Sequence, residues 1–177
     1  MASQALRRTI GVVFGLSVLA TSLGAQGSDA KPDSKAALDK LKSLKGTWTG
    51  TIGTPEGPPA VIRYEVRSNG TAVMETLFPD SDHEMVTVYH LDRSDLVATH
   101  YCASGNQPHF RLEKEKATAT ELSFGFTGGT NLDPATDAHI HSGRIRFVDE
   151  GRFEAEWDFY QAGKLAGGHR FLMSRKK

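Results

Sequence analysis

Strict alternation of apolar and polar side chains near the C-terminus predicts β-strands. At positions 153–159 the odd residues are apolar and the even residues are acidic, a period of two that gives a strand one dry face and one wet face. The segments on either side, 139–148 and 169–174, are also predicted to be strands and are separated from it by short turns that contain glycine. Three consecutive strands with one apolar face predict an antiparallel sheet that covers a core or a cavity.

The short turns set the register of these three strands. Trp157 is expected opposite Gly143 on one side and His169 on the other, and the missing side chain at position 143 leaves room for the indole ring. His141 is expected opposite Phe159. Because a slip of one residue would move every side chain to the other face, this register predicts which residues point inward.

Strand-like segments separated by turn residues continue through most of the chain. A single short helix comes first, capped by Asp33 or Ser34 and ended by Gly46. About ten consecutive strands would curl and close to remove their exposed edges. We therefore expect an all-β, up-and-down antiparallel barrel in one domain at residues 36–177, with a two-sheet sandwich as the alternative. The expected strands are 47–52, 60–67, 71–78, 85–91, 96–102, 109–116, 121–126, 139–148, 152–161 and 169–174.

The N-terminus has the pattern of a secretory signal peptide. Arg7 and Arg8 precede an apolar run at 10–20, and small residues follow at 22–25. The alternative, a membrane anchor, requires roughly 20 apolar residues, about twice the length of this run. We expect a signal peptide at residues 1–25, a flexible leader at 26–35, and export to the periplasm or the medium without a remaining membrane span.

Charge and cysteine content limit the possible partners. The 21 basic residues balance the 21 acidic ones, and signal cleavage would remove two basic residues and no acidic one. The mature chain would then carry a slight negative net charge, so we do not expect it to bind nucleic acid. The only cysteine, Cys102, has no internal disulfide partner, so the core alone must hold an exported domain together.

Four segments carry a resemblance to known proteins. The segment 41–50, with Gly46, Trp48 and Gly50, resembles the opening of calycin-type barrels such as lipocalins, in which a tryptophan of the first strand closes the barrel floor beside a short helix. Nitrobindin, a haem-binding ten-stranded barrel, begins similarly, although Ile52 here replaces its last glycine. Later parts, at 75–79, 83–87 and 99–108, resemble a group of exported bacterial proteins. The resemblance implies a calycin-like barrel and makes haem a candidate cofactor, but it supplies no haem ligand.

Histidines on the expected inner face are candidates for chemistry. His139 and His141 lie two positions apart, a spacing that can place two imidazoles on one metal ion. His169 lies two strands away, roughly 10 Å, so it would be a strained third ligand. The alternative is a pair of solvated histidines at the barrel mouth.

The hairpin formed by 85–91 and 96–102 has two faces of similar polarity. A two-residue turn pairs Tyr89 with Ala98 and Thr87 with His100, but the pattern does not say whether this face points inward. Glu75 poses a similar question. An inward carboxylate would need a partner, for which Arg63 and Arg111 are the candidates.

Two function classes follow, together with a structural alternative. The first is a non-enzymatic exported barrel that binds a small, largely apolar ligand. The second is a haem- or metal-dependent protein or enzyme that uses a cavity histidine, and the structural alternative is a domain with a filled core. No catalytic residue is assigned. The residues expected to contact the ligand are Tyr89, His100, His141, Trp157, Phe159, His169 and Phe171.

Overall fold

The computed structural model describes residues 32–177. The predicted signal peptide and most of the predicted leader lie outside this range. Helix α1 (Ser34–Lys42) begins with Asp33 as its N-cap, whose carboxylate accepts a hydrogen bond from the backbone N–H of Ala36 at 2.7 Å. Of the two expected caps, the structure uses Asp33, and Ser34 and Lys35 of the predicted leader belong to the helix.

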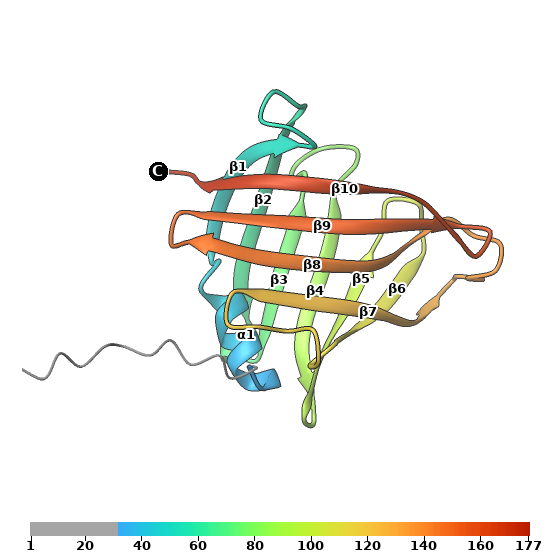
Figure 1. Cartoon of the computed structure of the whole chain (residues 1–177), viewed down its shortest axis with the longest axis horizontal. Helices are drawn as coiled ribbons and strands as arrows, with labels where there is room; N and C mark the ends of the chain where they lie inside the picture. Colours follow the sequence, from blue (N-terminus) through green and yellow to red (C-terminus); the bar gives the residue numbers. More distant parts are fainter. Residues whose placement is uncertain (1–31) are drawn as a thin grey trace, which may run out of the picture.

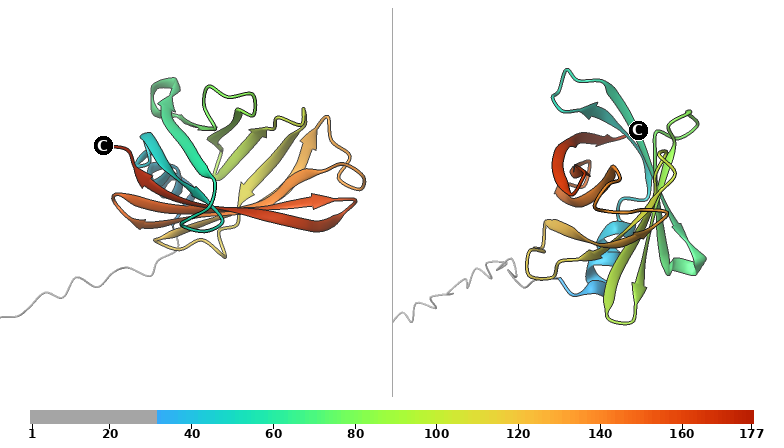
Figure 2. Two further views of the ribbon diagram at one scale, coloured as in Figure 1. Left: turned by 90° about the horizontal axis from the view of Figure 1, so that it is seen from above. Right: turned by 90° about the vertical axis from the view of Figure 1, so that its right-hand side faces the viewer.

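Ten antiparallel strands follow α1 and close into a barrel in which each strand pairs with its neighbours in sequence and β1 pairs with β10. Figures 1 and 2 show the strands following one another around the barrel, with α1 at one end. The predicted all-β, up-and-down barrel with one short helix is confirmed, and the sandwich alternative is wrong. The elements are β1 (Gly46–Ile52), β2 (Pro59–Arg67), the 3-10 turn η1 (Ser68–Gly70), β3 (Ala72–Leu77), β4 (Met85–Asp92), β5 (Asp95–Tyr101), β6 (Gln107–Leu112), β7 (Glu121–Thr130), β8 (His139–Asp149), β9 (Arg152–Gln161) and β10 (Lys164–Arg175).

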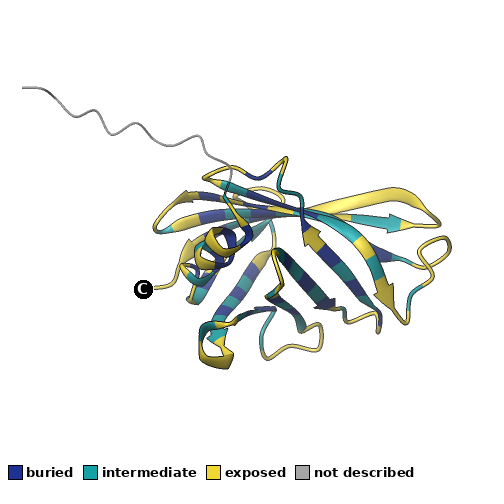
Figure 3. Cartoon of the chain, turned by 90° about the horizontal axis from the view of Figure 1, so that it is seen from below, coloured by how far each residue is buried: buried dark blue, intermediate teal, exposed yellow. Residues whose placement is uncertain are grey.

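Helix α1 covers one end of the barrel. Its apolar side, which includes Ala37, Leu38 and Leu41, is buried, and Figure 3 shows the buried stripe of the helix beside the strands. The indole N–H of Trp48 donates a hydrogen bond to the backbone carbonyl of Leu44 at 2.7 Å, which ties β1 to the end of the helical segment. The ring of Trp48 also contacts Phe153, which contacts Tyr64 in turn, so aromatic rings pack together in this part of the interior.

The predicted register of the last three strands holds on both sides of Trp157, which pairs with Gly143 on β8 and His169 on β10. The predicted pairing of His141 with Phe159 is wrong. A β-bulge between Ile140 and Ser142 inserts one unpaired residue, so Ile140 is the partner of Phe159. Bulges of this kind bend the strand and increase its twist, and barrel rims commonly contain them.

Strand β7 is longer than the sequence predicts. Gly128 and Gly129 lie beyond the expected strand 121–126, yet they belong to β7 and pair with β6 across an irregularity next to His109. Gly128 has φ of +134°, a conformation that L side chains rarely adopt, so glycine is required for the strand to continue through this point.

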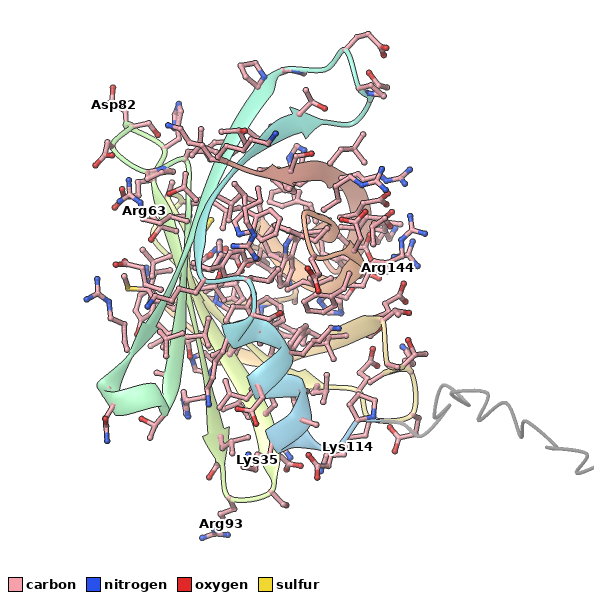
Figure 4. All side chains as sticks on the ribbon, turned by 90° about the vertical axis from the view of Figure 1, so that its left-hand side faces the viewer. Lys35, Arg63, Asp82, Arg93, Lys114 and Arg144 are labelled. Carbon is pink, nitrogen blue, oxygen red and sulfur yellow. The ribbon has the colours of Figure 1, made fainter. Side chains whose placement is uncertain are left out.

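The outer face of β8, β9 and β10 carries a ladder of ion pairs. Arg144 pairs with Glu156, and Glu154 lies between Arg146 and Arg170. In Figure 4 the labelled side chains of Arg63, Arg93 and Arg144 extend outward from the barrel. Such exposed pairs contribute little stability each, about 0–1 kcal/mol, but they mark this face as the solvent side. Within residues 32–177, no helix is long and apolar enough to cross a lipid bilayer.

Candidate functional site

A cavity of about 120 Å³ lies inside the barrel at the end away from α1. Its walls come from the ends of β1, β3 and β5, from the beginnings of β4 and β8, and from Trp157 of β9 and two residues of β10. Lys40 of α1 lies over the ring of Phe147, near the opposite end of β8. The residues that line it are mostly apolar: Ile52, Leu77, Phe78, Met85, Thr87, His100, Ile140, Trp157, His169 and Phe171.

Burial of the lining residues gives the cavity a deep end and a rim. Leu77, Thr87, His100, Trp157 and Phe171 are buried, and they form the deep end. The rest of the lining is half-buried, except for His169, which is exposed and therefore marks the side facing solvent. Tyr64 and Phe153, which do not line the cavity, pack against each other deeper in the interior.

His100 supplies the polar group of the deep end. Its Nδ1 lies 2.9 Å from Oγ1 of Thr87, the residue directly opposite on β4. Its Nε2 is buried and has no hydrogen-bond partner among the described residues. Burial lowers the pKa of His100 to about 4, so the ring is neutral at physiological pH. The pairing of Thr87 with His100 confirms the predicted register of the hairpin and settles that this face points inward.

A row of polar side chains crosses four neighbouring strands on the inner face. Tyr64 pairs with Glu75, Glu75 pairs with Thr87, and Thr87 pairs with His100. All of them are buried. Glu75 therefore points inward, one of the two orientations that its sequence allowed.

Glu75 is held by tyrosines rather than by an arginine. The hydroxyl of Tyr89 donates to Oε2 of Glu75 at 2.5 Å. The proposed partners Arg63 and Arg111 are wrong, because they lie on the outer face and bond Asp80 and Asp95 instead. An inward arginine would require a second buried charge, whereas a neutral hydroxyl satisfies the carboxyl without one.

Burial raises the pKa of Glu75 to about 7, against the opposing effect of the hydroxyl groups of Tyr89 and Tyr64. Tyr64 lies close enough to exert this effect, yet its hydroxyl makes no hydrogen bond of normal geometry, and Oε1 of Glu75 is also without a partner. A protonated Glu75 can donate a hydrogen bond, so the neutral form suits this environment better than the carboxylate.

A second cluster, of histidine and aromatic rings, lies at the same end of the barrel around the bulge in β8. The ring of His141 stacks on Tyr160, with centroids 3.9 Å apart, and on Phe126, at 4.8 Å. Nε2 of His139 lies 3.1 Å from Nδ1 of His141, and Nδ1 of His139 lies 2.9 Å from the carbonyl oxygen of Asp137. Both ring nitrogens of His139 are thus engaged in hydrogen bonds. Among residues 32–177, no group of three or more His, Cys, Asp or Glu side chains is placed to hold a metal ion.

The structure brings together some of the residues expected to contact a ligand and separates others. His100, Trp157, His169 and Phe171 line the cavity. Tyr89 is buried beside Glu75 and Phe124, in the filled part of the interior. His141, the unpaired residue of the bulge, belongs to the aromatic cluster. Phe159 of β9 is half-buried and does not line the cavity.

Sequence reasoning did not name several lining residues. Ile52, Leu77 and Met85 share inward positions of their strands with residues of the core, so alternation alone was a sufficient signal for them. Phe78 and Ile140 gave no such signal, since one follows the end of β3 and the other lies beside the bulge.

The fold and cavity define a closed ten-stranded antiparallel barrel with one hollow end. A comparison with models of known protein families gives no match, and a comparison with curated proteins also gives none. The likeness to calycins therefore consists of the barrel architecture and the opening segment with Trp48.

Haem, which the resemblance to nitrobindin implies, does not fit this cavity. An apolar cavity of about 150 Å³ holds a single benzene ring. The cavity here is about 120 Å³, and a porphyrin is several times the size of one ring.

Proposed function

We propose that the chain is an exported, calycin-like barrel that binds a small, largely apolar molecule in the hollow end of its interior. The observation that carries the proposal is the cavity itself. Its lining is mostly apolar, with Leu77, Trp157 and Phe171 buried, and its polar lining residues are few, as is typical of ligand sites. Its volume is slightly below that of an apolar cavity known to hold one benzene ring. A domain with only a structural role would be expected to fill this space with side chains, since interiors are normally close-packed.

The chemistry of the lining residues favours binding over catalysis. Its titratable side chains are His100 and His169. Among the described residues, the hydroxyl bonded to His100 is that of Thr87, and the lowered pKa of this buried imidazole makes it a weak base for activating a hydroxyl. Burial of a ligand between Trp157 and Phe171 would remove apolar surface from water at a gain of about 25 cal/mol per Å².

Binding of toluene to the purified protein tests this function. Toluene should raise the melting temperature, because a ligand present at about 100 times its Kd stabilises the folded state by about 2.7 kcal/mol. Mass spectrometry under native conditions should also detect any apolar molecule that the protein retains from its host. Absence of binding by toluene, benzene and a retained ligand would contradict the proposal and favour the filled-core alternative.

Two variants on the same strand locate the binding site. Ile140→Phe enlarges a half-buried residue of the lining, so it should weaken toluene binding by filling part of the cavity. Val148→Phe makes the same kind of change at an exposed position of β8 and should leave binding as it is. Equal affinities in the two variants would place the bound toluene outside the cavity.

A further inference from the structure

A buried ring nitrogen of a residue that lines the cavity has no hydrogen-bond partner among the described residues. His100 is only 6% exposed and lines the cavity, and its Nε2 makes no hydrogen bond among the described residues. Leaving a buried polar atom without a partner destabilises the unliganded protein. A ligand that bonds to Nε2 removes this destabilisation, whereas a pure hydrocarbon does not.

Thr87 holds the imidazole in this orientation. Thr87 lies directly opposite His100 on the neighbouring strand, and its Oγ1 is 2.9 Å from Nδ1 of His100. The hydroxyl is therefore the hydrogen-bond partner of Nδ1. A ligand would therefore meet Nε2, and not Nδ1.

The chemistry of the site restricts the charge of the ligand. His100 is neutral, since burial lowers its pKa to about 4, and no arginine or lysine is among the lining residues. A carboxylate in this cavity would be a buried charge without a counterion, and an ammonium would meet the same penalty. A neutral polar group is the type that fits.

The tautomer of His100 determines which type of neutral ligand group can hydrogen-bond to Nε2. If Nδ1 donates to Thr87, Nε2 accepts a hydrogen bond, and if the hydroxyl of Thr87 donates to Nδ1, Nε2 donates. A ligand hydroxyl satisfies both cases because it can donate and accept. A carbonyl group matches one of the two tautomers.

We propose that the cavity selects a small monocyclic ligand with one neutral hydroxyl group, of which phenol is the simplest aromatic example, and that this hydroxyl hydrogen-bonds to Nε2 of His100. The proposal rests on the proposed function, because it names the ligand class for the same cavity. The ring of the ligand would lie among Trp157, Phe171 and Phe78, and the hydroxyl of the ligand would supply the hydrogen-bond partner that Nε2 of His100 lacks. Phenols remain neutral at pH 7, since their pKa is about 10.

The affinity ratio between phenol and benzene tests the proposal. Both probes have nearly the same shape, so their ratio reports the hydroxyl, and titration calorimetry or ligand-detected NMR at pH 7 measures it. Phenol should bind the unmodified protein more tightly than benzene, and sodium benzoate should bind more weakly than either. A preference for benzoate would show that the site takes a charge and would overturn the proposal.

His100→Leu tests the assigned partner. This variant should keep its affinity for benzene and lower the phenol-to-benzene ratio about tenfold, the factor that corresponds to about 1.4 kcal/mol. His100→Gln can place an amide near the position of Nε2, so the ratio should return to within about threefold of that of the unmodified protein. His90→Leu is the matched control, because His90 lies exposed on the outside of β4 and its replacement should not change the ratio.

The outcomes separate the two proposals. Benzene binding with the same ratio in the unmodified protein and in His100→Leu would overturn the hydroxyl assignment while the apolar site stands. Failure of both phenol and benzene to bind the unmodified protein would contradict the binding function itself. Benzene binding by His100→Leu also demonstrates that this variant is folded.

Discussion

The indole ring of Trp157 covers Gly143 across the ladder between β8 and β9. A Cβ atom at position 143 would lie 2.2 Å from Cε3 of this ring, far closer than real Cβ contacts. The ring can occupy this place only because residue 143 is glycine, and from there it reaches Phe110 and the wall of the cavity.

Gly143→Ala should therefore destabilise the protein by about 1–3 kcal/mol, the usual cost of overpacking, and Trp157→Ala should cost about 3–5 kcal/mol. Urea unfolding measures both. Gly151→Ala is the control in the same hairpin, because its new Cβ would come no closer than 3.6 Å to a neighbour. A loss below about 1 kcal/mol for Trp157→Ala would be inconsistent with its burial.

Tyr89→Phe should destabilise the fold by about 1–3 kcal/mol, because it removes the hydroxyl that bonds Glu75 and leaves both carboxyl oxygens without a partner. Tyr64→Phe is the matched comparison. Its hydroxyl has no hydrogen bond of normal geometry, so its loss should cost clearly less. Equal losses in chemical denaturation of the two variants would mean that Tyr64 supports Glu75 as strongly as Tyr89 does.

Glu75 and His100 should give stability opposite dependences on pH. The pKa of Glu75 is raised from 4.5 to about 7, so between these values the folded state keeps a proton that the unfolded chain has lost, and the free energy of unfolding falls as pH rises. The pKa of His100 is lowered from 6.5 to about 4, so the unfolded chain binds the extra proton there and the free energy of unfolding rises with pH. From pH 4.5 to 6.5 the two contributions nearly cancel.

Removing one group at a time should expose the other. Relative to the unmodified protein, the free energy of unfolding of Glu75→Gln should gain up to about 2 kcal/mol between pH 4.5 and 6.5, and that of His100→Gln should lose a similar amount, since one pKa unit corresponds to 1.36 kcal/mol. Urea unfolding at pH 4.5, 5.5 and 6.5 gives the slopes. Glu56→Gln, at an exposed position of the loop between β1 and β2, should follow the unmodified protein. Parallel curves for all variants would contradict the assigned shifts.

His169→Ala should weaken binding of an apolar probe such as toluene and leave the melting temperature nearly unchanged. The side chain of His169 lines the cavity yet is exposed. In the variant without ligand, water takes the place of the imidazole, so the stability of the fold changes little. A ligand bound to the variant loses a contact at the rim of the cavity. Thermal unfolding and probe titration of the same sample measure the two effects. Lowered melting with unchanged affinity would assign His169 a structural role instead.

Export is expected from the N-terminal pattern of Arg7, Arg8 and the apolar run that follows. The mature protein isolated from the periplasm or the medium should begin between Ser22 and Ser28, which N-terminal sequencing or intact mass determines. An exported protein that still carries Met1 would show that this segment is not cleaved.

Alternation in the sequence by itself determined much of this protein. The apolar residues of β9 and the short turns around it were enough to place Trp157 opposite Gly143 and His169, because a slip of one residue would turn the apolar face to solvent. The number of strands with hardly any helix was likewise sufficient for the up-and-down barrel, since a long sheet that leaves its edges open is unfavourable.

Only the tertiary structure decided the details of the interior. The sequence left the inner face of the β4 and β5 hairpin open, because both faces are nearly equally apolar and only closure of the barrel selects Thr87 and His100 for the inside. The partner of Glu75 and the bulge at His141 depend on which strands curve toward each other, and no local pattern carries that information. The hollow end has the same origin, since a cavity is the space that distant side chains leave between them once the barrel has closed.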